Sequence, residues 1–405
     1  MPDLALISPY QSDQLKPLFV ADDAEREHLH ARARAAPPMV ISSAAAANAV
    51  MLGAGYFTPL NGFMSKADAL SVADSMHTSE GLFWPVPVLN LVDHCASSFI
   101  NRTIALRDPN IETHPVLAVQ KVDCLEELTD AEIAYIAERT FGTADQNHPG
   151  VKKFLSQGRF LLSGPIQVLN FSYFEKEFVG TFRTATQIRD EIKAQGWRRV
   201  VAFQTRNPMH RAHEELCKMA AKSVAADGVL IHMLLGKLKS GDIPAQVRDA
   251  AIRKMVELYF EPNTVIIAGY GFDMLYAGPR EAVLHAIFRQ NAGCSHLIVG
   301  RDHAGVGDYY GAFDAQLIFD QAVPDEALEI QIFRADHTAY SKKLDRVVMM
   351  RDVPDHNTED FVLLSGTRVR ELLAAGKPLP REFARPEVAE ILRQHFLDSH
   401  NRAAD

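Results

Sequence analysis

Between residues 198 and 333, short apolar runs alternate with segments long enough to form helices, and this alternation restricts the folds open to the chain. Apolar runs that are each followed by a helix of ten or more residues are typical of a parallel sheet covered on both faces. We therefore expect an α/β domain, assigned to residues 173–330, with strands at residues 198–204, 228–236, 263–270, 295–300 and 328–333. The helices between them are expected at residues 209–222, 244–260, 279–293 and 310–323.

Capping residues predict two helix boundaries in this region. Thr184 and Gln187 form a capping-box pattern, and the helix that they open is expected to end at Gly196. Asn207 is predicted to be the N-cap of the helix that follows the opening strand, with Pro208 at its first position.

The regions before and after this domain lack its regular alternation of strands and helices. Residues 1–172 contain short strands broken by Pro and Gly, which favours a barrel-like or α+β domain. Its strands are expected within residues 57–64, 82–93, 102–108 and 114–122, and its helices within residues 41–55, opened by Ser42 or Ser43, and 127–142. Residues 331–405 predict a small helical domain, with Thr367 as the cap and Gly376 as the stop of one helix, and Pro386 in the first turn of another.

Composition narrows the class of protein and its compartment. A net charge of −9, from 42 Lys and Arg against 51 Asp and Glu, excludes nucleic-acid binding through bulk electrostatics. The 4 cysteines stand far apart without a CxxC pair, which indicates a reducing, cytoplasmic environment. The sequence shows neither an apolar run of membrane-spanning length nor a secretory signal, so we expect no membrane association.

Polar runs follow four successive strands of the predicted sheet. In an open parallel sheet, ligands bind outside the carboxyl ends of the strands, so these runs should converge on one edge. The runs are "QTRNPMHRAH", "GKLKSGD", "GYGFDMLYAGPRE" and "GRDHAGVGDYYG", and they bring the cations Arg206, Lys237, Lys239 and Arg301. A protein with this charge balance that binds anions must concentrate its positive groups locally, as these loops do.

The first run suits an anionic ligand. A helix that starts at Asn207 and Pro208 would direct free N–H groups and the positive end of its dipole toward the sheet edge. His210 and His213 are three residues apart, hence on one face, where imidazoles can stabilise charge on a leaving group. Arg206 offers a planar fork that matches a tetrahedral oxyanion.

Each motif alone also has an ordinary structural interpretation. A lone HxxH is more often a surface or core pair, and this run is not the zinc motif HExxH, because Glu214 follows the second histidine. "GRDHAG" by itself could be a glycine-rich turn, and the lysines of "GKLKSGD" would usually face solvent. The functional interpretation gains weight because the runs occupy equivalent places in successive β-α units.

The combination of "AFQTRNPMHRAHE" with "GRDHAG" closely resembles the ATP sulfurylase (sulfate adenylyltransferase) family. The resemblance extends through "GYFTPLNGFM", "FWPVPV", "MLYAGPREAVLHAIFRQNAGCSHLIVGRDHAG" and "SGTRVRELLAAGKPLPREFARPEVAEIL", and so spans most of the chain. It implies a PUA-like barrel domain, a Rossmann-like central domain of the HIGH nucleotidyltransferase type, and a small C-terminal domain. It also implies a homodimer.

The family transfers the adenylyl group of MgATP to sulfate, which forms adenylyl sulfate and pyrophosphate. Sulfate carries two negative charges and must approach an α-phosphate that carries one. At about 4 Å and an effective dielectric near 20, that repulsion is roughly 8 kcal/mol. Fixed cations must offset it, and catalysis can then rest on positioning and charge stabilisation without a covalent enzyme intermediate.

The resemblance also implies roles for individual residues. Gln204 and Arg206 are expected to hold sulfate together with the backbone of Ala304. The catalytic set is expected to be Thr205, Arg206, Asn207, His210 and His213. The nucleotide is expected to contact Gln204, Asn207, His210, His213, Gly300, Arg301, Asp302 and His303, with Lys237 and Lys239 as possible further anion support.

Three departures from the family pattern bear on the ligands. Ser341 and Leu344 stand where many bacterial relatives have zinc-binding cysteines, and His356 alone does not make a zinc site, so we expect no bound metal apart from the Mg²⁺ of MgATP. Leu275 replaces an expected arginine, which could loosen anion binding, and Val306 replaces a common proline. The sequence contains no GxxxxGK[ST], so a fused adenylyl-sulfate kinase is not expected.

Two other functions remain open at this point. Another HIGH-like adenylyltransferase would explain the histidine pair but not "QTRN" together with "GRDHAG". An RNA-binding module built on the PUA-like half is opposed by the acidic balance of the chain.

Overall fold

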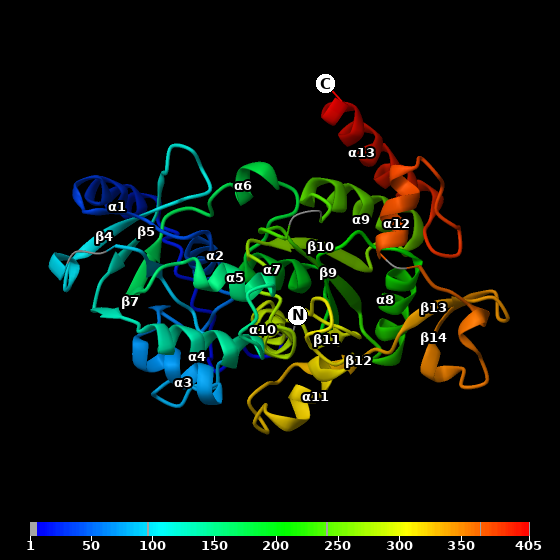
Figure 1. Ribbon diagram of the computed structural model, residues 1–405, viewed down its shortest axis with the longest axis horizontal. Helices are drawn as coiled ribbons and strands as arrows, with labels where there is room; N and C mark the ends of the chain where they lie inside the picture. Colours follow the sequence, from blue (N-terminus) through cyan, green and yellow to red (C-terminus); the bar gives the residue numbers. More distant parts are fainter. Residues whose placement is uncertain (1–5, 95–96, 240–241, 365, 405) are drawn as a thin grey trace.

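The computed structural model describes residues 6–94, 97–239, 242–364 and 366–404. The chain forms an N-terminal half, a central sheet with its helices, and a C-terminal segment that lies beside the central helices (Figure 1). The parts follow one another along the chain, but the first described residues contact the central part: the Tyr10 N–H donates to the Asn291 side chain at 2.8 Å, and Arg189 donates to the Ile7 carbonyl oxygen at 2.6 Å.

The N-terminal half contains a mixed sheet in the order β1-β4-β5-β7-β2, with β3 and β6 also paired to β7. Its strands are β1 (Pro38–Val40), β2 (Gly62–Phe63), β3 (Leu91–Val92), β4 (Thr103–Arg107), β5 (Val116–Lys121), β6 (Cys124–Glu127) and β7 (Phe160–Val168). Its helices are α1 (Asp23–Ala35), α2 (Ser43–Gly53), α3 (Lys66–Ser75), η1 (Ser97–Phe99), α4 (Asp130–Phe141) and α5 (Pro149–Leu155). The short α6 (Phe174–Glu177) follows in the connection to the central sheet.

The prediction for this half was partly right. Helix α2 begins after Ser42, whose side chain accepts from the Ala45 N–H, and β5 and α4 lie where they were expected. The predicted strands at 57–64 and 82–93 shrink to two residues each, because prolines interrupt both stretches. Strand β7 was not predicted. It contains Gly164 at φ +131 and Pro165, yet it pairs with β2, β3, β5 and β6.

The central sheet has the order β10-β9-β8-β11-β12, and every pairing in it is parallel. Its strands are β8 (Val200–Thr205), β9 (Gly228–Leu234), β10 (Val265–Tyr270), β11 (His296–Val299) and β12 (Gln331–Arg334). The helices around it are α7 (Ala185–Ala194), α8 (Arg211–Ser223), α9 (Ala245–Tyr259), α10 (Pro279–Asn291) and α11 (Asp314–Gln321). All five predicted strands are confirmed.

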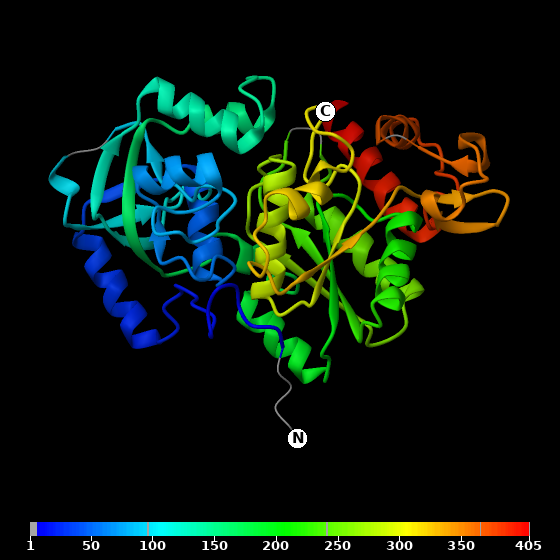
Figure 2. The ribbon, with the colours of Figure 1, turned by 90° about the horizontal axis from the view of Figure 1, so that it is seen from below.

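The strand order reverses between β8 and β11, which makes their carboxyl ends the switch point where such sheets bind ligands. Figure 2 shows α10 between the sheet and the N-terminal half, whereas α8 lies on the opposite face toward the C-terminal segment. The buried core is continuous between the N-terminal half and the central part. The centre of the Phe57 ring lies 5.4 Å from that of Phe288 in α10 and 6.0 Å from that of Phe272.

The C-terminal segment contains helices α12 (Gly366–Ala374) and α13 (Pro386–Ala404), the 3₁₀ turns η2 (Met350–Asp352) and η3 (Thr358–Asp360), and a small sheet. That antiparallel sheet, in the order β14-β13-β15, was not predicted; its strands are β13 (Thr338–Ser341), β14 (Arg346–Met349) and β15 (Phe361–Val362). Thr367 lies inside α12, so its prediction as the helix cap was wrong. The proposed boundary after residue 330 falls just before β12, which belongs to the central sheet.

Candidate active site

The loops that follow β8 and β11 meet in one pocket of about 300 Å³ at the switch point of the sheet. The runs 204–213 and 300–305, which are remote in sequence, therefore share a cavity as expected. The lining residues are Phe203, Gln204, Thr205, Arg206, Asn207, His210, Ala212, His213, Leu216, Ile298, Gly300, Arg301, Asp302, His303, Ala304, Asp336, His337 and Thr338.

Arg206 is fixed at the boundary between the two loops. Its Nη2 donates to the carbonyl oxygen of Gly305 at 2.8 Å, and its guanidinium carbon lies 4.8 Å from the centre of the Tyr276 ring. Its Nη1 is buried and has no hydrogen-bond partner among the described residues. A buried cationic nitrogen without an acceptor is costly, so this geometry suits an anionic oxygen supplied by a ligand.

The helix after β8 starts later than predicted. The Thr205 hydroxyl donates to the Asn207 carbonyl oxygen at 2.8 Å and accepts from the Asn207 N–H at 3.1 Å, which holds residues 205–207 in a tight turn. Helix α8 consequently begins at Arg211 with His210 as its N-cap, and the prediction of Asn207 as N-cap and Pro208 as first helical residue was wrong. The exposed Asn207 lies in the loop before the helix.

His210 and His213 form a stacked pair at the start of α8, with ring centres 3.8 Å apart. Phe383 of the C-terminal segment stacks on His210 at 4.6 Å, and its carbonyl oxygen accepts from the Arg211 N–H at 3.0 Å. Burial lowers the pKa of His213 to about 4, and burial together with His213 and His337 holds the pKa of His210 well below its ordinary value. Both rings are therefore neutral at pH 7.

The contacts of His213 indicate its tautomer. Its Nδ1 faces the backbone N–H of His210 at 3.4 Å and acts as the acceptor. A neutral ring that accepts at Nδ1 carries its proton on Nε2. That N–H can donate to a ligand oxygen without bringing a full charge into the pocket.

The loop after β11 has an unusual backbone. Asp302 and Ala304 adopt positive φ, +54 and +57, although neither is glycine. Such conformations cost free energy and gather at ligand sites, where the surrounding contacts enforce them. The Ala304 carbonyl oxygen accepts from the Gly278 N–H at 3.1 Å, which anchors the loop to the start of α10.

The side chains of this loop divide between interior and solvent. His303 Nε2 lies 3.0 Å from Nδ1 of the buried His285, and burial, with smaller effects from Arg289 and Arg206, lowers the pKa of His303 to about 3. Arg301 and Asp302 are about half exposed and pair with each other at 3.2 Å. His303 thus commits one ring nitrogen to the interior, whereas Arg301 remains at the pocket rim.

The remaining predicted residues differ in their proximity to the pocket. Gln204 donates through its side-chain nitrogen to the Tyr270 hydroxyl at 3.3 Å. Lys239 lines an adjoining pocket of about 270 Å³ together with Arg206 and His303, but its ammonium group pairs with Asp242 at 2.6 Å. Lys237 is exposed and lines neither pocket.

One wall of the pocket was not predicted from the sequence. Asp336, His337 and Thr338 line it, and they follow the fifth strand, β12. The same rule about strand ends would have found them, had it been applied to this strand as well as to the first four.

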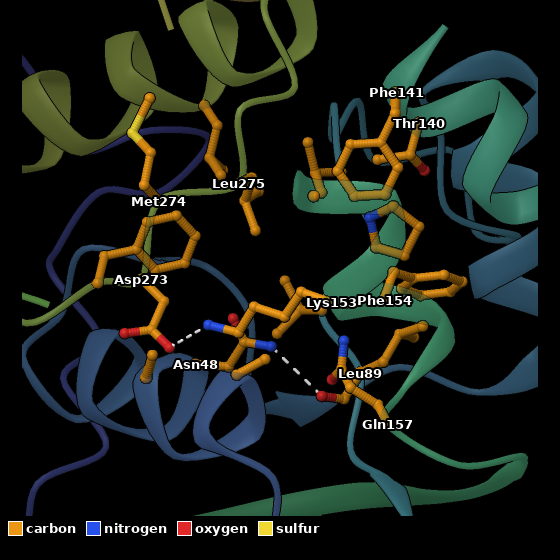
Figure 3. A pocket seen from close by; sticks show the side chains of 18 of the residues that line it. Asn48, Leu89, Thr140, Phe141, Lys153, Phe154, Gln157, Asp273, Met274 and Leu275 are labelled. Carbon is orange, nitrogen blue, oxygen red and sulfur yellow. Dashed lines mark hydrogen bonds and ion pairs between the residues drawn. The ribbon is translucent and has the colours of Figure 1, made fainter. Parts of the chain in front are cut away.

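Leu275 does not lie in the anion pocket. Its side chain lines a separate cavity of about 60 Å³ between the N-terminal half and the central sheet, beside Phe141 and Phe154 (Figure 3). The loss of an arginine at this position therefore removes no cation from the pocket lining of the present structure. Val306 lines the adjoining pocket that contains Lys239.

The position of the family's zinc site holds a hydrogen bond between side chains. Ser341 Oγ lies 2.9 Å from His356 Nε2, and the Leu344 N–H donates to the same hydroxyl at 3.1 Å. Within the described residues, no group of three or more His, Cys, Asp or Glu could hold a metal ion. The absence of zinc stays a prediction.

None of the helices in the described part of the chain has the length and apolar character needed to cross a bilayer.

Comparison with known proteins agrees with this architecture. A PUA-like domain model matches residues 7–171, and an ATP-sulfurylase model matches residues 180–395. The structure called "Hexameric APS kinase from Thiobacillus denitrificans" shares the fold with a TM-score of 0.73 at 22% identity, over 96% of this chain and 69% of that chain.

Two curated relatives are similar over almost their whole length. The sulfate adenylyltransferase of Alcanivorax borkumensis is 66% identical over 97% of this chain and 98% of that protein. The sulfate adenylyltransferase of Allochromatium vinosum is 63% identical over 96% of this chain and 98% of its own length. With its two matched domains and the convergent loops at the switch point, this chain belongs to the ATP sulfurylase (sulfate adenylyltransferase) family.

Proposed function

We propose that the pocket between the β8 and β11 loops is where this sulfate adenylyltransferase transfers the adenylyl group of ATP to sulfate by direct attack. The activity itself, which forms adenylyl sulfate and pyrophosphate, is that of the family. In the proposed step a sulfate oxygen forms a bond to the α-phosphorus while the bond from that phosphorus to the bridging oxygen of pyrophosphate breaks. Sulfate is already ionised, so no proton needs to be removed from the nucleophile.

The observation that carries this proposal is the unpartnered Nη1 of Arg206 at the meeting point of the two loops. We assign sulfate to Arg206, the Gln204 amide and the backbone of Ala304. A guanidinium held in place before the substrate arrives offsets part of the repulsion between sulfate and the α-phosphate without reorganisation during the reaction.

The nucleotide is assigned to the other side of the pocket. His210 and His213, as neutral N–H donors at the start of α8, would stabilise the charge that builds on the departing pyrophosphate. Asn207 would contact the phosphates, and the loop of Gly300, Arg301, Asp302 and His303 would receive the nucleoside. Thr205 shapes the loop through its bonds to Asn207.

Mg²⁺ is proposed to enter with the nucleotide as MgATP. Mg²⁺ prefers oxygen ligands and usually keeps several waters. The phosphates of ATP and water molecules can therefore supply most of its ligands. Asp302 and Asp336 are the carboxylates that line the pocket. We also propose that the chain forms a homodimer in the cytoplasm, as its family resemblance implies.

The test follows the reaction in both directions. Pyrophosphate release from MgATP should depend on added sulfate, and ATP should form from adenylyl sulfate and pyrophosphate. Release that is independent of sulfate, or the absence of ATP formation in the reverse assay, would contradict the assignment.

A further inference from the structure

The loop after β10 contains one tyrosine that contacts the loops after the neighbouring strands. Tyr276 is only 3% exposed, and it adopts φ +62, a conformation that a bulky residue rarely takes. A side chain that merely filled the core would not require this backbone. The surrounding contacts must therefore hold the turn in place.

The backbone of this turn is held from three directions. The Glu281 carboxylate accepts from the Leu275 N–H at 3.1 Å and from the Ala277 N–H at 3.0 Å. The Tyr276 carbonyl oxygen accepts from the Tyr310 hydroxyl at 2.9 Å and lies 3.0 Å from His148 Nε2. His148 Nδ1 accepts from two backbone N–H groups, so its proton is on Nε2 and it donates to this carbonyl.

The side chain of Tyr276 faces the active-site loops. Its hydroxyl accepts from the Lys239 N–H at 2.8 Å, in the loop after β9. Its ring lies under the Arg206 guanidinium, 4.8 Å from the guanidinium carbon, in the loop after β8. Tyr276 thus joins three loops whose positions in the sequence are far apart.

These contacts constrain Arg206. A free arginine side chain samples many rotamers, and ordering it when the substrate binds costs conformational entropy. The aromatic face fixes the plane of the guanidinium, and the bond from Nη2 to Gly305 fixes its rotation within that plane. Nη1 is buried and has no acceptor among the described residues, so it can donate to a ligand.

We propose that Tyr276 is a positioning residue for sulfate: its ring orients the Arg206 guanidinium so that Nη1 faces the oxyanion. This role rests on the proposed placement of sulfate at Arg206. The aromatic ring carries the effect, whereas the hydroxyl serves the loop that contains Lys239.

The test compares Tyr276→Leu, which removes the ring, with Tyr276→Phe, which keeps it. The sulfate KM is measured at saturating MgATP, and the MgATP KM at saturating sulfate. Tyr276→Leu should raise the sulfate KM about 10–30-fold, as expected for loss of a desolvated cation–π contact, and the MgATP KM less than about threefold. Tyr276→Phe should keep the sulfate KM within about threefold of the wild-type value.

Tyr259→Leu is the matched control, because Tyr259 also lies under an arginine, Arg385 at 4.1 Å, but outside the pocket. It should lower the melting temperature and leave both KM values near those of the wild type. Should Tyr276→Leu be unstable, Tyr276→Asn also removes the ring and tolerates positive φ better. The same selective rise in sulfate KM is expected for it.

An unchanged sulfate KM in Tyr276→Leu or Tyr276→Asn would overturn the proposal, and so would an equal rise in Tyr276→Phe. Failure of the proposed function gives a different result. In that case the wild-type protein would itself show no sulfate-dependent release of pyrophosphate.

Discussion

The pocket at the switch point and the cavity between the two larger parts of the molecule differ in how they treat charge. In the cavity the charged groups are paired: Lys153 contacts Asp273 at 2.5 Å (Figure 3). Asp273 also accepts from Ser43 Oγ and from the Lys237 N–H. In the pocket, Arg206 keeps a buried nitrogen that finds no acceptor in the described part of the chain. The cavity leaves only a neutral hydroxyl, that of Thr140, unpartnered among its described lining side chains, whereas the pocket leaves a charged donor that suits an anionic ligand.

The pocket and the cavity also differ in backbone conformation. Asp302 and Ala304 in the pocket, and Tyr276 beside it, have positive φ without being glycine. Most residues that line the cavity are instead apolar, and none of those described has a positive φ. An enclosed apolar cavity is therefore a weaker guide to function here than a polar pocket with a strained rim.

The largest effect should come from Arg206→Ala. We expect the kcat/KM for sulfate to fall at least about 1000-fold, because the variant loses the cation that offsets repulsion between two anions. The melting temperature should change little, since the side chain is only half-buried. Sulfate-dependent pyrophosphate release and thermal unfolding measure the two quantities. Near-normal release of pyrophosphate would show that Arg206 does not serve sulfate, and the pocket would then be no better a candidate site than the cavity.

His213→Gln should have the next largest effect, a fall in kcat of about 100-fold from loss of a donor to pyrophosphate. It should also change acid stability. The pKa of His213 falls from its ordinary 6.5 to about 4 in the folded protein, so the unfolded chain binds more protons between these values. The stability that the neutral ring contributes is complete above about pH 6.5 and is lost as the pH falls toward 4.

Unfolding of wild type and His213→Gln at pH 7.5 and pH 5 checks the sign of this effect. The wild type should lose more stability between these pH values than the variant does. His28→Gln, at an exposed position on α1, is the control. A greater loss in His213→Gln would show that the ring is charged in the free protein.

Asp273→Ala tests the cavity. We expect a loss of about 2–3 kcal/mol in the free energy of unfolding, because the variant leaves Lys153 and two other donors without their acceptor. The sulfate KM should stay within about threefold of the wild type, since Asp273 does not line the pocket. A rise in sulfate KM beyond tenfold would show that the cavity and the pocket are coupled.

The smallest effect is expected for Leu275→Ala, a loss of about 1–2 kcal/mol in stability with no change in sulfate KM beyond twofold. The residue is partly buried in the cavity, so some of its transfer free energy is lost. Leu275→Arg sharpens the comparison. A lower sulfate KM in that variant would place the side chain at the anion site after all.

The central sheet could be predicted because its signal is local. Strand β9 is buried along its whole length, and an apolar run of that kind is readable without knowledge of its neighbours. Strand β7 gives no such signal, because Gly164 and Pro165 interrupt it. Its place in the sheet depends on pairing with four other strands.

The residues of the candidate site could be predicted from motifs and strand ends, but their mutual contacts could not. The bond from the Thr205 hydroxyl to Asn207, which delays α8, competes with a capping pattern that looked equally favourable in sequence. The stacking of Arg206 on Tyr276 joins residues separated by 70 positions in the numbering. The sequence around either residue does not indicate this contact.

The stacking of Phe383 on His210 has a consequence for biosynthesis. A nascent chain that ends before this phenylalanine already contains every side chain assigned to sulfate and nucleotide. Its histidine pair would nevertheless lack an aromatic cover, and the first amide of α8 would lack the carbonyl that receives its hydrogen bond. The protein is therefore expected to become active only when its C-terminal segment has packed against α8, after all the side chains of the site have been synthesised.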